Sequence, residues 1–239
     1  MPICANRCSR CMPTRLSTKW GCDMRYWLLG VMAVVMAACE SSSYDSGDGH
    51  YSYMQAEMVD AYTKDKGVIS RVVTDEGKAL QLQPTITAKW AAKADTLYRA
   101  LFYYDYHDAA TTVKPRSIGA VPVLRPVETT RPDTLRTDPL GLESAWRSTT
   151  GRYINMRLAL KAGAKDNGEM GRQTVGVKCD TLRTGSREQF TFTLLHNQNG
   201  VPEYYTQVAF VSIPLDERAQ EADIVVRVNT YGGLMERRY

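Results

Sequence analysis

The chain has 239 residues, 44% hydrophobic and 23% charged, and its 30 basic and 26 acidic residues give a formal net charge of +4. Five of the basic residues but only one acidic residue precede Cys39, so the rest of the chain carries equal numbers of both. This balance, with the two signs interspersed, excludes the basic stripe that follows a nucleic-acid backbone. We therefore expect no nucleic-acid partner.

Residues 27–39 form an uncharged apolar segment that follows Arg25 and is closed by small residues. This is the layout of a secretory signal with its cleavage site. The segment is too short to span a bilayer, which takes about 20 apolar residues in a helix. The sequence therefore predicts export.

The end of this segment resembles the lipobox of bacterial lipoproteins, in which a cysteine receives lipid and becomes the first residue. The lipobox residues before Cys39 are Met36, Ala37 and Ala38. We expect residues 1–38 to be removed as leader and signal peptide, Cys39 to be lipidated, and the small, polar residues 39–50 to form a tether.

A second cysteine pattern lies inside the leader. Cys4, Cys8 and Cys11 have the spacing of cluster ligands in radical enzymes dependent on S-adenosylmethionine, which hold an iron–sulfur cluster through thiolates. Because they precede the export signal, they are removed with the leader, or never made if translation starts at Met24. We expect no metal and no cofactor. With Cys39 lipidated, Cys179 is the one cysteine left, which leaves no intramolecular disulfide.

Residues 51–127 are predicted to form a first domain. Strands are expected over 53–62, 68–74, 79–83, 97–106 and 111–127. The first strand alternates, with Met54, Ala56 and Met58 on its apolar side. Residues 87–94 are alanine-rich, which predicts a short helix between the third and fourth strands. Three strands, a helix and two strands are the chain order of the five-stranded OB barrel.

The fourth expected strand has an aromatic face made of Tyr98, Phe102, Tyr104 and Tyr106. OB folds use aromatic platforms to stack nucleic-acid bases, which is one interpretation. The other is packing in a small barrel core with the tyrosine hydroxyls at the rim. The balanced charge and the predicted export favour packing.

Residues 128–140 contain two prolines and no strand period, so we interpret them as a linker. Residues 141–239 are predicted to form a second domain in which strands recur without helices. These strands are expected over 152–160, 173–179, 189–196, 204–213 and 223–230. Alternating apolar positions and turn signals such as Asn199-Gly200 predict an antiparallel β-sandwich, and an all-β fold class for the whole protein.

Several short motifs resemble those of the NigD-like lipoproteins of Bacteroides relatives, in the same order and over nearly all of the chain after the leader. Besides the leader and Cys39, they are residues 72–77, Trp146, and residues 151–156, 195–197 and 211–215. The resemblance implies an N-terminal OB-like domain and a C-terminal β-sandwich. The family is named from a bacteriocin locus, which suggests immunity, and it has no established catalytic residues to carry over.

Few residues are candidates for chemistry. The histidines are His50, His107 and His196, and no two have metal-ligand spacing. His196 ends a strand beside a turn and is the best candidate for a catalytic or ligand contact, although a turn histidine bonded to backbone is the simpler interpretation. Cys179 falls on the apolar face of its strand, where a cysteine behaves as a small hydrophobe rather than as a nucleophile.

Trp146, at the entrance to the second domain, is the remaining candidate. It is either a platform that stacks on a sugar or a packing residue, since tryptophan usually buries its large apolar area.

Two classes of function follow. The first is a non-catalytic protein that binds a protein or a peptide, with immunity as one such role; the second is a hydrolase or glycan-binding protein of the cell envelope. OB and sandwich folds serve both classes. We expect a monomer that is attached by its lipid to the outer membrane, on the periplasmic or the surface face.

Overall fold

The computed structural model describes residues 53–106, 111–127, 135–165, 168–184 and 187–239. The leader, the lipobox-like residues, the tether, His50 and His107 lie outside the described residues. Within the described part, no helix is both long and apolar enough to cross a membrane.

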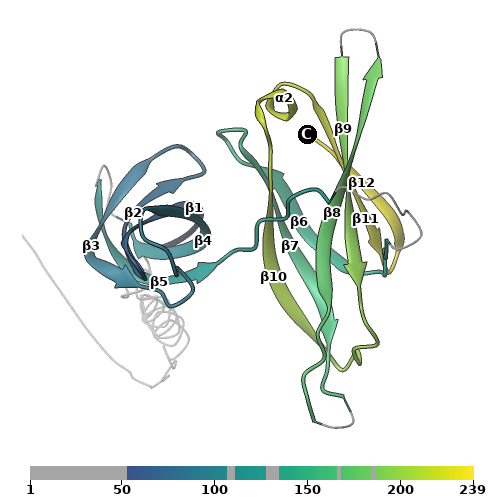
Figure 1. Cartoon of the computed structure of the whole chain (residues 1–239), viewed down its shortest axis with the longest axis horizontal. Coiled ribbons are helices and arrows are strands. Elements are labelled where there is room, and N and C mark those ends of the chain that lie inside the picture. The colour runs from purple at the N-terminus through teal and green to yellow at the C-terminus, as the bar shows by residue number, and fades with distance from the viewer. Residues whose placement is uncertain (1–52, 107–110, 128–134, 166–167, 185–186) are drawn as a thin grey trace, which may run out of the picture. The chain divides into compact units, whose positions relative to one another are not determined.

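The first half of the described chain is a closed five-stranded barrel (Figure 1). Its strands are β1 (Met54–Asp65), β2 (Val68–Thr74), β3 (Ala79–Thr87), β4 (Thr96–Asp105) and β5 (Thr112–Ala120). They close in the order β1-β2-β3-β5-β4, with β3 and β5 parallel and the other pairs antiparallel. The predicted barrel is confirmed.

The short helix predicted over 87–94 is wrong. The chain turns there instead, and its backbone bonds to the β1–β2 turn: Gly67 donates to the Ala91 carbonyl at 2.8 Å, and Ala88 donates to the Gly67 carbonyl at 2.8 Å. Ala88 and Ala91 are buried in the barrel core. These tertiary contacts outweigh the helical preference of alanine.

The inward face of β1 is also the opposite of the predicted one. Val59 and Ala61 are fully buried in the barrel core, whereas Met54 is 40% exposed. Gln55 and Glu57 share the face of Val59 and accept hydrogen bonds from the Tyr104 hydroxyl at 3.2 and 2.8 Å. Because polar side chains of β1 point inward at one end of the barrel, the sequence pattern indicated the wrong inward face.

The aromatic residues of β4 pack inside the barrel, as expected. Phe102 and Tyr104 are buried and stacked, with ring centroids 5.0 Å apart. Tyr98 packs against this core and meets the Trp90 ring edge-on at 5.7 Å. Burial raises the pKa of the Tyr104 hydroxyl. The aromatic face therefore belongs to the barrel core, as the packing interpretation expected.

The second half of the described chain is two sheets around one apolar core (Figure 1). One sheet has the order β10-β7-β6 and the other β12-β11-β9-β8. The elements are β6 (Gly141–Arg147), β7 (Tyr153–Ala162), β8 (Thr174–Thr184), β9 (Arg187–Asn197), β10 (Tyr205–Pro214), α2 (Glu217–Gln220), β11 (Asp223–Thr230) and β12 (Gly233–Arg238). Alternate residues of β7 and β9 fill the core, as the sequence period predicted, and alternate residues of β10 also lie there.

One pair departs from the predicted antiparallel arrangement. β9 and β11 are parallel, with Phe190 opposite Ile224. Between them the chain passes through β10 in the other sheet and through α2, and this crossover returns β11 in the direction of β9. Asp216 caps α2 by accepting a hydrogen bond from the Ala219 amide at 2.8 Å.

The last strand of the barrel is shorter than predicted. β5 ends at Ala120, and the following residues leave the barrel to pair with both sheets. Val123 forms a bridge with Ser212 of β10, and Pro126 forms one with Val177 of β8. Residues 121–127, which we call the connecting segment, therefore belong to the sandwich edges.

Candidate functional site

A buried polar cluster surrounds Arg99 of β4. Its guanidinium donates to Asp60 at 3.3 Å, Asp75 at 2.7 Å, Asn155 at 3.0 Å and Ser212 at 3.3 Å. The Arg99 side chain is 1% exposed. A guanidinium presents five N–H donors in a fixed plane, and here four hydrogen bonds from it reach four different residues.

These contacts join the barrel to the sandwich, which belong to one compact unit. Asp60 and Asp75 come from the barrel, whereas Asn155 of β7 and Ser212 of β10 come from the sandwich and are paired in register. The Ser212 hydroxyl donates to Asn155 at 2.7 Å, and the Asn155 amide donates to Asp75 at 2.7 Å. We call Arg99 and these four partners the arginine joint.

Two further residues of the sandwich close the joint. Arg152 forms an ion pair with Asp60 at 2.9 Å, and the Tyr153 ring lies 4.1 Å from the Arg99 guanidinium carbon. Burial, and then the nearby Asp60 carboxylate, raise the pKa of the Tyr153 hydroxyl. The polar groups of the joint bond to one another. The joint therefore holds the barrel and the sandwich together.

The motifs that resemble the NigD-like lipoproteins meet at this joint. Asp75 lies in residues 72–77, Asn155 in residues 151–156 and Ser212 in residues 211–215. Sequence reasoning did not identify Arg99, because it stands on the outward face of a barrel strand and its Ser212 partner is 113 residues away. The order of these motifs was the only sequence signal for the joint.

His196 is buried at the end of β9, and its exposed fraction is 1%. Its Nδ1 lies 3.1 Å from the Asp138 carbonyl oxygen, and its Nε2 lies 2.7 Å from the Gln173 side-chain oxygen. The His196 amide also donates to the Arg136 carbonyl at 2.9 Å. The ring and the backbone amide of His196 therefore contact neighbouring segments that pack against β9.

Trp146 lies on β6 and is 36% exposed. Its neighbour Ala145 packs against the sandwich core, which places Trp146 on the outer face of the sheet. The structure thus leaves the indole accessible, and its sugar-stacking interpretation stays a prediction. Among the described residues, the pocket that His196 lines does not include Trp146. The lipobox-like residues Met36, Ala37, Ala38 and Cys39 lie outside the described chain.

Cys179 is partly buried in a pocket of about 510 Å³ beside the connecting segment. Phe190, Phe192 and Leu215 make its apolar floor. Burial, and then the Asp180 carboxylate, raise the pKa of the Cys179 thiol. The predicted role as a small hydrophobe agrees with this position.

Because the thiolate is the reactive form, a raised pKa lowers the reactive fraction at any given pH. We expect Cys179 to react with iodoacetamide at pH 8 several-fold more slowly in the folded chain than in guanidinium chloride. Peptide mass spectrometry separates its adduct from those of other cysteines, and a Cys179→Ser variant verifies the assignment. Equal rates in the two states would show that burial does not protect this thiol.

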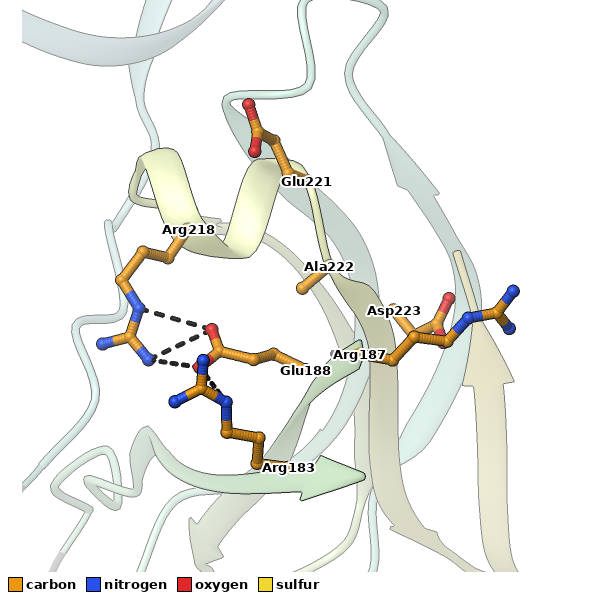
Figure 2. Close-up of a pocket in the computed structure, with 7 residues that line it drawn as sticks. All are labelled: Arg183, Arg187, Glu188, Arg218, Glu221, Ala222 and Asp223. Carbon is orange, nitrogen blue, oxygen red and sulfur yellow. Dashed lines mark hydrogen bonds and ion pairs between the residues drawn. The ribbon is translucent and has the colours of Figure 1, made fainter. Parts of the chain in front are cut away.

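A polar pocket of about 440 Å³ lies between α2 and the β8–β9 hairpin (Figure 2). Arg218 of α2 donates to both Glu188 oxygens, at 3.0 and 3.1 Å, and Arg183 approaches Glu188 at 3.8 Å. Glu221 points away from this cluster in Figure 2. Three basic and three acidic residues line the pocket, so its charge does not favour an anionic ligand. Among the described residues, no three His, Cys, Asp or Glu side chains are grouped to hold a metal ion.

The fold therefore defines a two-part all-β protein, an OB-type barrel followed by a β-sandwich with a buried arginine between them. The chain shares this fold with a NigD-like immunity protein from Bacteroides caccae, at 24% identity and a TM-score of 0.62 over 77% of this chain and 96% of that one. It is also similar to a protein from Parabacteroides distasonis proposed to be toxin-related, with 15% identity and a TM-score of 0.58 over 78% of this chain and 92% of that one.

A third similar structure is a protein from Bacteroides fragilis proposed to be a lipoprotein, at 12% identity and a TM-score of 0.54 over 78% of this chain and 96% of that one. No family model matches the sequence, and no curated protein matches it. At these identities the structures establish the fold, and the resemblance to NigD-like proteins inferred from the sequence is confirmed at that level.

Proposed function

We propose that this protein is attached by lipid at Cys39 to the outer membrane and acts there by binding a protein partner, without catalysis, as an immunity protein does. The observation that carries the proposal is the fold shared with a NigD-like immunity protein over nearly all of that chain. The lipobox-like residues before Cys39 and the likeness to a proposed lipoprotein support the anchor.

The side chains that could in principle take part in catalysis support a binding role instead. The Arg99 guanidinium donates to four partners in the arginine joint, and each ring nitrogen of His196 lies within hydrogen-bond distance of a protein oxygen. Cys179 is partly buried with a raised pKa. A nucleophile or general base needs a free, oriented atom, and each of these groups is used in packing or bonding.

The anchor is tested by metabolic labelling with palmitate in the native host. We expect label in the membrane fraction for the unchanged chain and none for Cys39→Ala, because more than one buried acyl chain makes release very slow. Cys22→Ala is the matched control, since it removes a leader cysteine outside the lipobox. An intact, unmodified amino terminus in the cytosolic fraction would refute the anchor.

The partner is tested by affinity purification of the tagged lipoprotein from its own membranes after chemical crosslinking. We expect a specific protein that is retained by Cys22→Ala and depleted with Cys39→Ala, because the anchor brings the two together. Recovery of a glycan alone, or turnover of an envelope substrate by the purified chain, would instead favour the alternative class.

A further inference from the structure

The first half of β10 is a sheet edge that the described chain leaves open. β10 ends the sheet with the order β10-β7-β6, and Tyr205, Thr206, Gln207 and Val208 are exposed. Tyr205 and Val208 retain 44% and 43% of their accessible surface. No charged residue occurs between Glu203 and Asp216. Natural edge strands are usually protected by charges, prolines or bulges, and this stretch has none of these before Pro214.

The backbone groups on the open side follow from the pairing at Ser212. The Ser212 amide donates to the Pro122 carbonyl at 3.0 Å, and its carbonyl accepts from the Leu124 amide at 2.8 Å, both away from β7. Backbone groups alternate between the two sides of a strand, and the β10–β7 register runs without a shift. The amides and carbonyls of Val208 and Phe210 therefore also point to the open side.

The connecting segment limits what can pair there. By occupying the edge at Ser212, it leaves a notch of five residues, Thr206 to Phe210. A symmetric dimer paired about Val208 would place residue 204 of each copy at Ser212 of the other, where the connecting segment already lies. A single extended segment that ends at Phe210 meets no such obstacle, so the notch fits a partner's strand better than a second copy.

The outer face of the notch carries a charge pattern. Thr206 is paired in register with Lys161, and the Lys161 ammonium lies 3.1 Å from the Thr206 hydroxyl. Phe210 is paired with Arg157, whose guanidinium carbon lies 5.9 Å from the ring centroid. Between them, Val208 faces Ala159. Lys161 and Arg157 of β7 thus lie beside the two ends of the notch, and the small residue Ala159 lies beside its centre. Arg157 also forms an ion pair with Glu143 at 3.0 Å.

We propose that the β10 notch binds an extended segment of a partner protein by strand addition, and that this segment presents an apolar side chain between two acidic ones at alternate positions. Main-chain hydrogen bonds to Val208 and Phe210 supply attachment, and the basic groups of β7 select the sequence. This inference rests on the proposed protein-binding function and names its surface.

The test uses the full lipidated chain in detergent micelles and the blocked peptide Asp-Thr-Val-Thr-Asp, whose pattern reads the same in both directions. Amide hydrogen exchange of residues 205–210 is followed by mass spectrometry during a peptide titration. At ten times the measured Kd we expect exchange at Val208 and Phe210 to slow about tenfold, because binding protects by mass action. The peptide Lys-Thr-Val-Thr-Lys is expected to give no protection.

Two variants make the test specific. Val208→Pro removes an amide on the open side without touching the β7 ladder, and we expect it to abolish protection by the acidic peptide. Lys161→Glu is expected to reverse the preference, so that the lysine peptide protects better than the acidic one. Lys66→Glu, an exposed charge reversal in the β1–β2 turn, is the matched control and is expected to behave as the unchanged chain.

Three results overturn the inference: no protection at millimolar peptide, equal protection by both peptides, or edge protection that depends on protein concentration and so reports a second copy. Crosslinking from membranes separates the two proposals. A partner retained equally by Val208→Pro binds elsewhere, which refutes the notch and keeps the binding function, whereas the absence of any specific partner refutes the function itself.

Discussion

Replacing Arg99 with methionine is expected to lower the free energy of unfolding by about 3–5 kcal/mol, the usual cost of removing one partner from a buried ion pair. Methionine is long and apolar, so it largely refills the space of the arginine. The lost charge therefore dominates the change in the free energy of unfolding. Asp60 is only 4% exposed and keeps Arg152. Asp75 keeps Asn155, while its Oδ1 is buried without a partner among the described residues.

The measurement is urea unfolding followed by far-ultraviolet circular dichroism, with tryptophan fluorescence as a second probe. Arg71→Met is the matched control: Arg71 is exposed on β2, with its guanidinium carbon 5.0 Å from the Tyr62 ring centroid. A change of less than about 0.5 kcal/mol is expected there. If both variants lost the same free energy, the joint would contribute no more than a surface contact.

The arginine joint also predicts how the two parts unfold. In the unchanged chain we expect the two probes to give one transition, because the four partners of Arg99 come from both the barrel and the sandwich. In Arg99→Met the two transitions are expected to separate, since the barrel is then coupled to the sandwich through fewer links, among them the connecting segment, the Arg152–Asp60 ion pair and the bonds of Asp75 to Asn155 and Thr150.

The strands could be predicted from the sequence because one face of each is buried, and burial imposes a period of two. Phe190, Phe192 and Leu194 of β9 all lie in the core, as their spacing indicated. The same rule failed where an outward face is also covered. Asn155 alternates with core residues of β7 and looks solvent-facing, but the barrel buries it completely.

The local preference for helix also gave a wrong prediction where the contacting residue is distant in the sequence. The alanine-rich residues 87–94 favour a helix in isolation, yet Ala88 and Ala91 fill the barrel core and their backbone pairs with Gly67. The open edge of β10 could not be predicted either, because a strand pattern does not say which side has a neighbour. These features depend on topology, which single-strand patterns do not encode.

The second large loss of stability is expected from a substitution in the barrel core. Phe102→Ala is expected to cost about 3–5 kcal/mol, the range for truncating a buried aromatic residue and leaving a cavity. Phe102 is fully buried and stacked on Tyr104, with ring planes at 10°, so its neighbours can close the space only by disturbing that stack. Thermal and urea unfolding of the same variant measure the loss.

Leu97→Ala is the matched control on the same strand, because Leu97 is 59% exposed. We expect a change of less than about 0.5 kcal/mol there, as for other surface substitutions.

The two variants, Phe102→Ala and Leu97→Ala, also distinguish the two interpretations of the aromatic face. A stacking platform would lose affinity for single-stranded nucleic acid while keeping its stability, whereas a core residue loses stability first. A small effect of Phe102→Ala, close to that of Leu97→Ala, would contradict the packing of β4 described above.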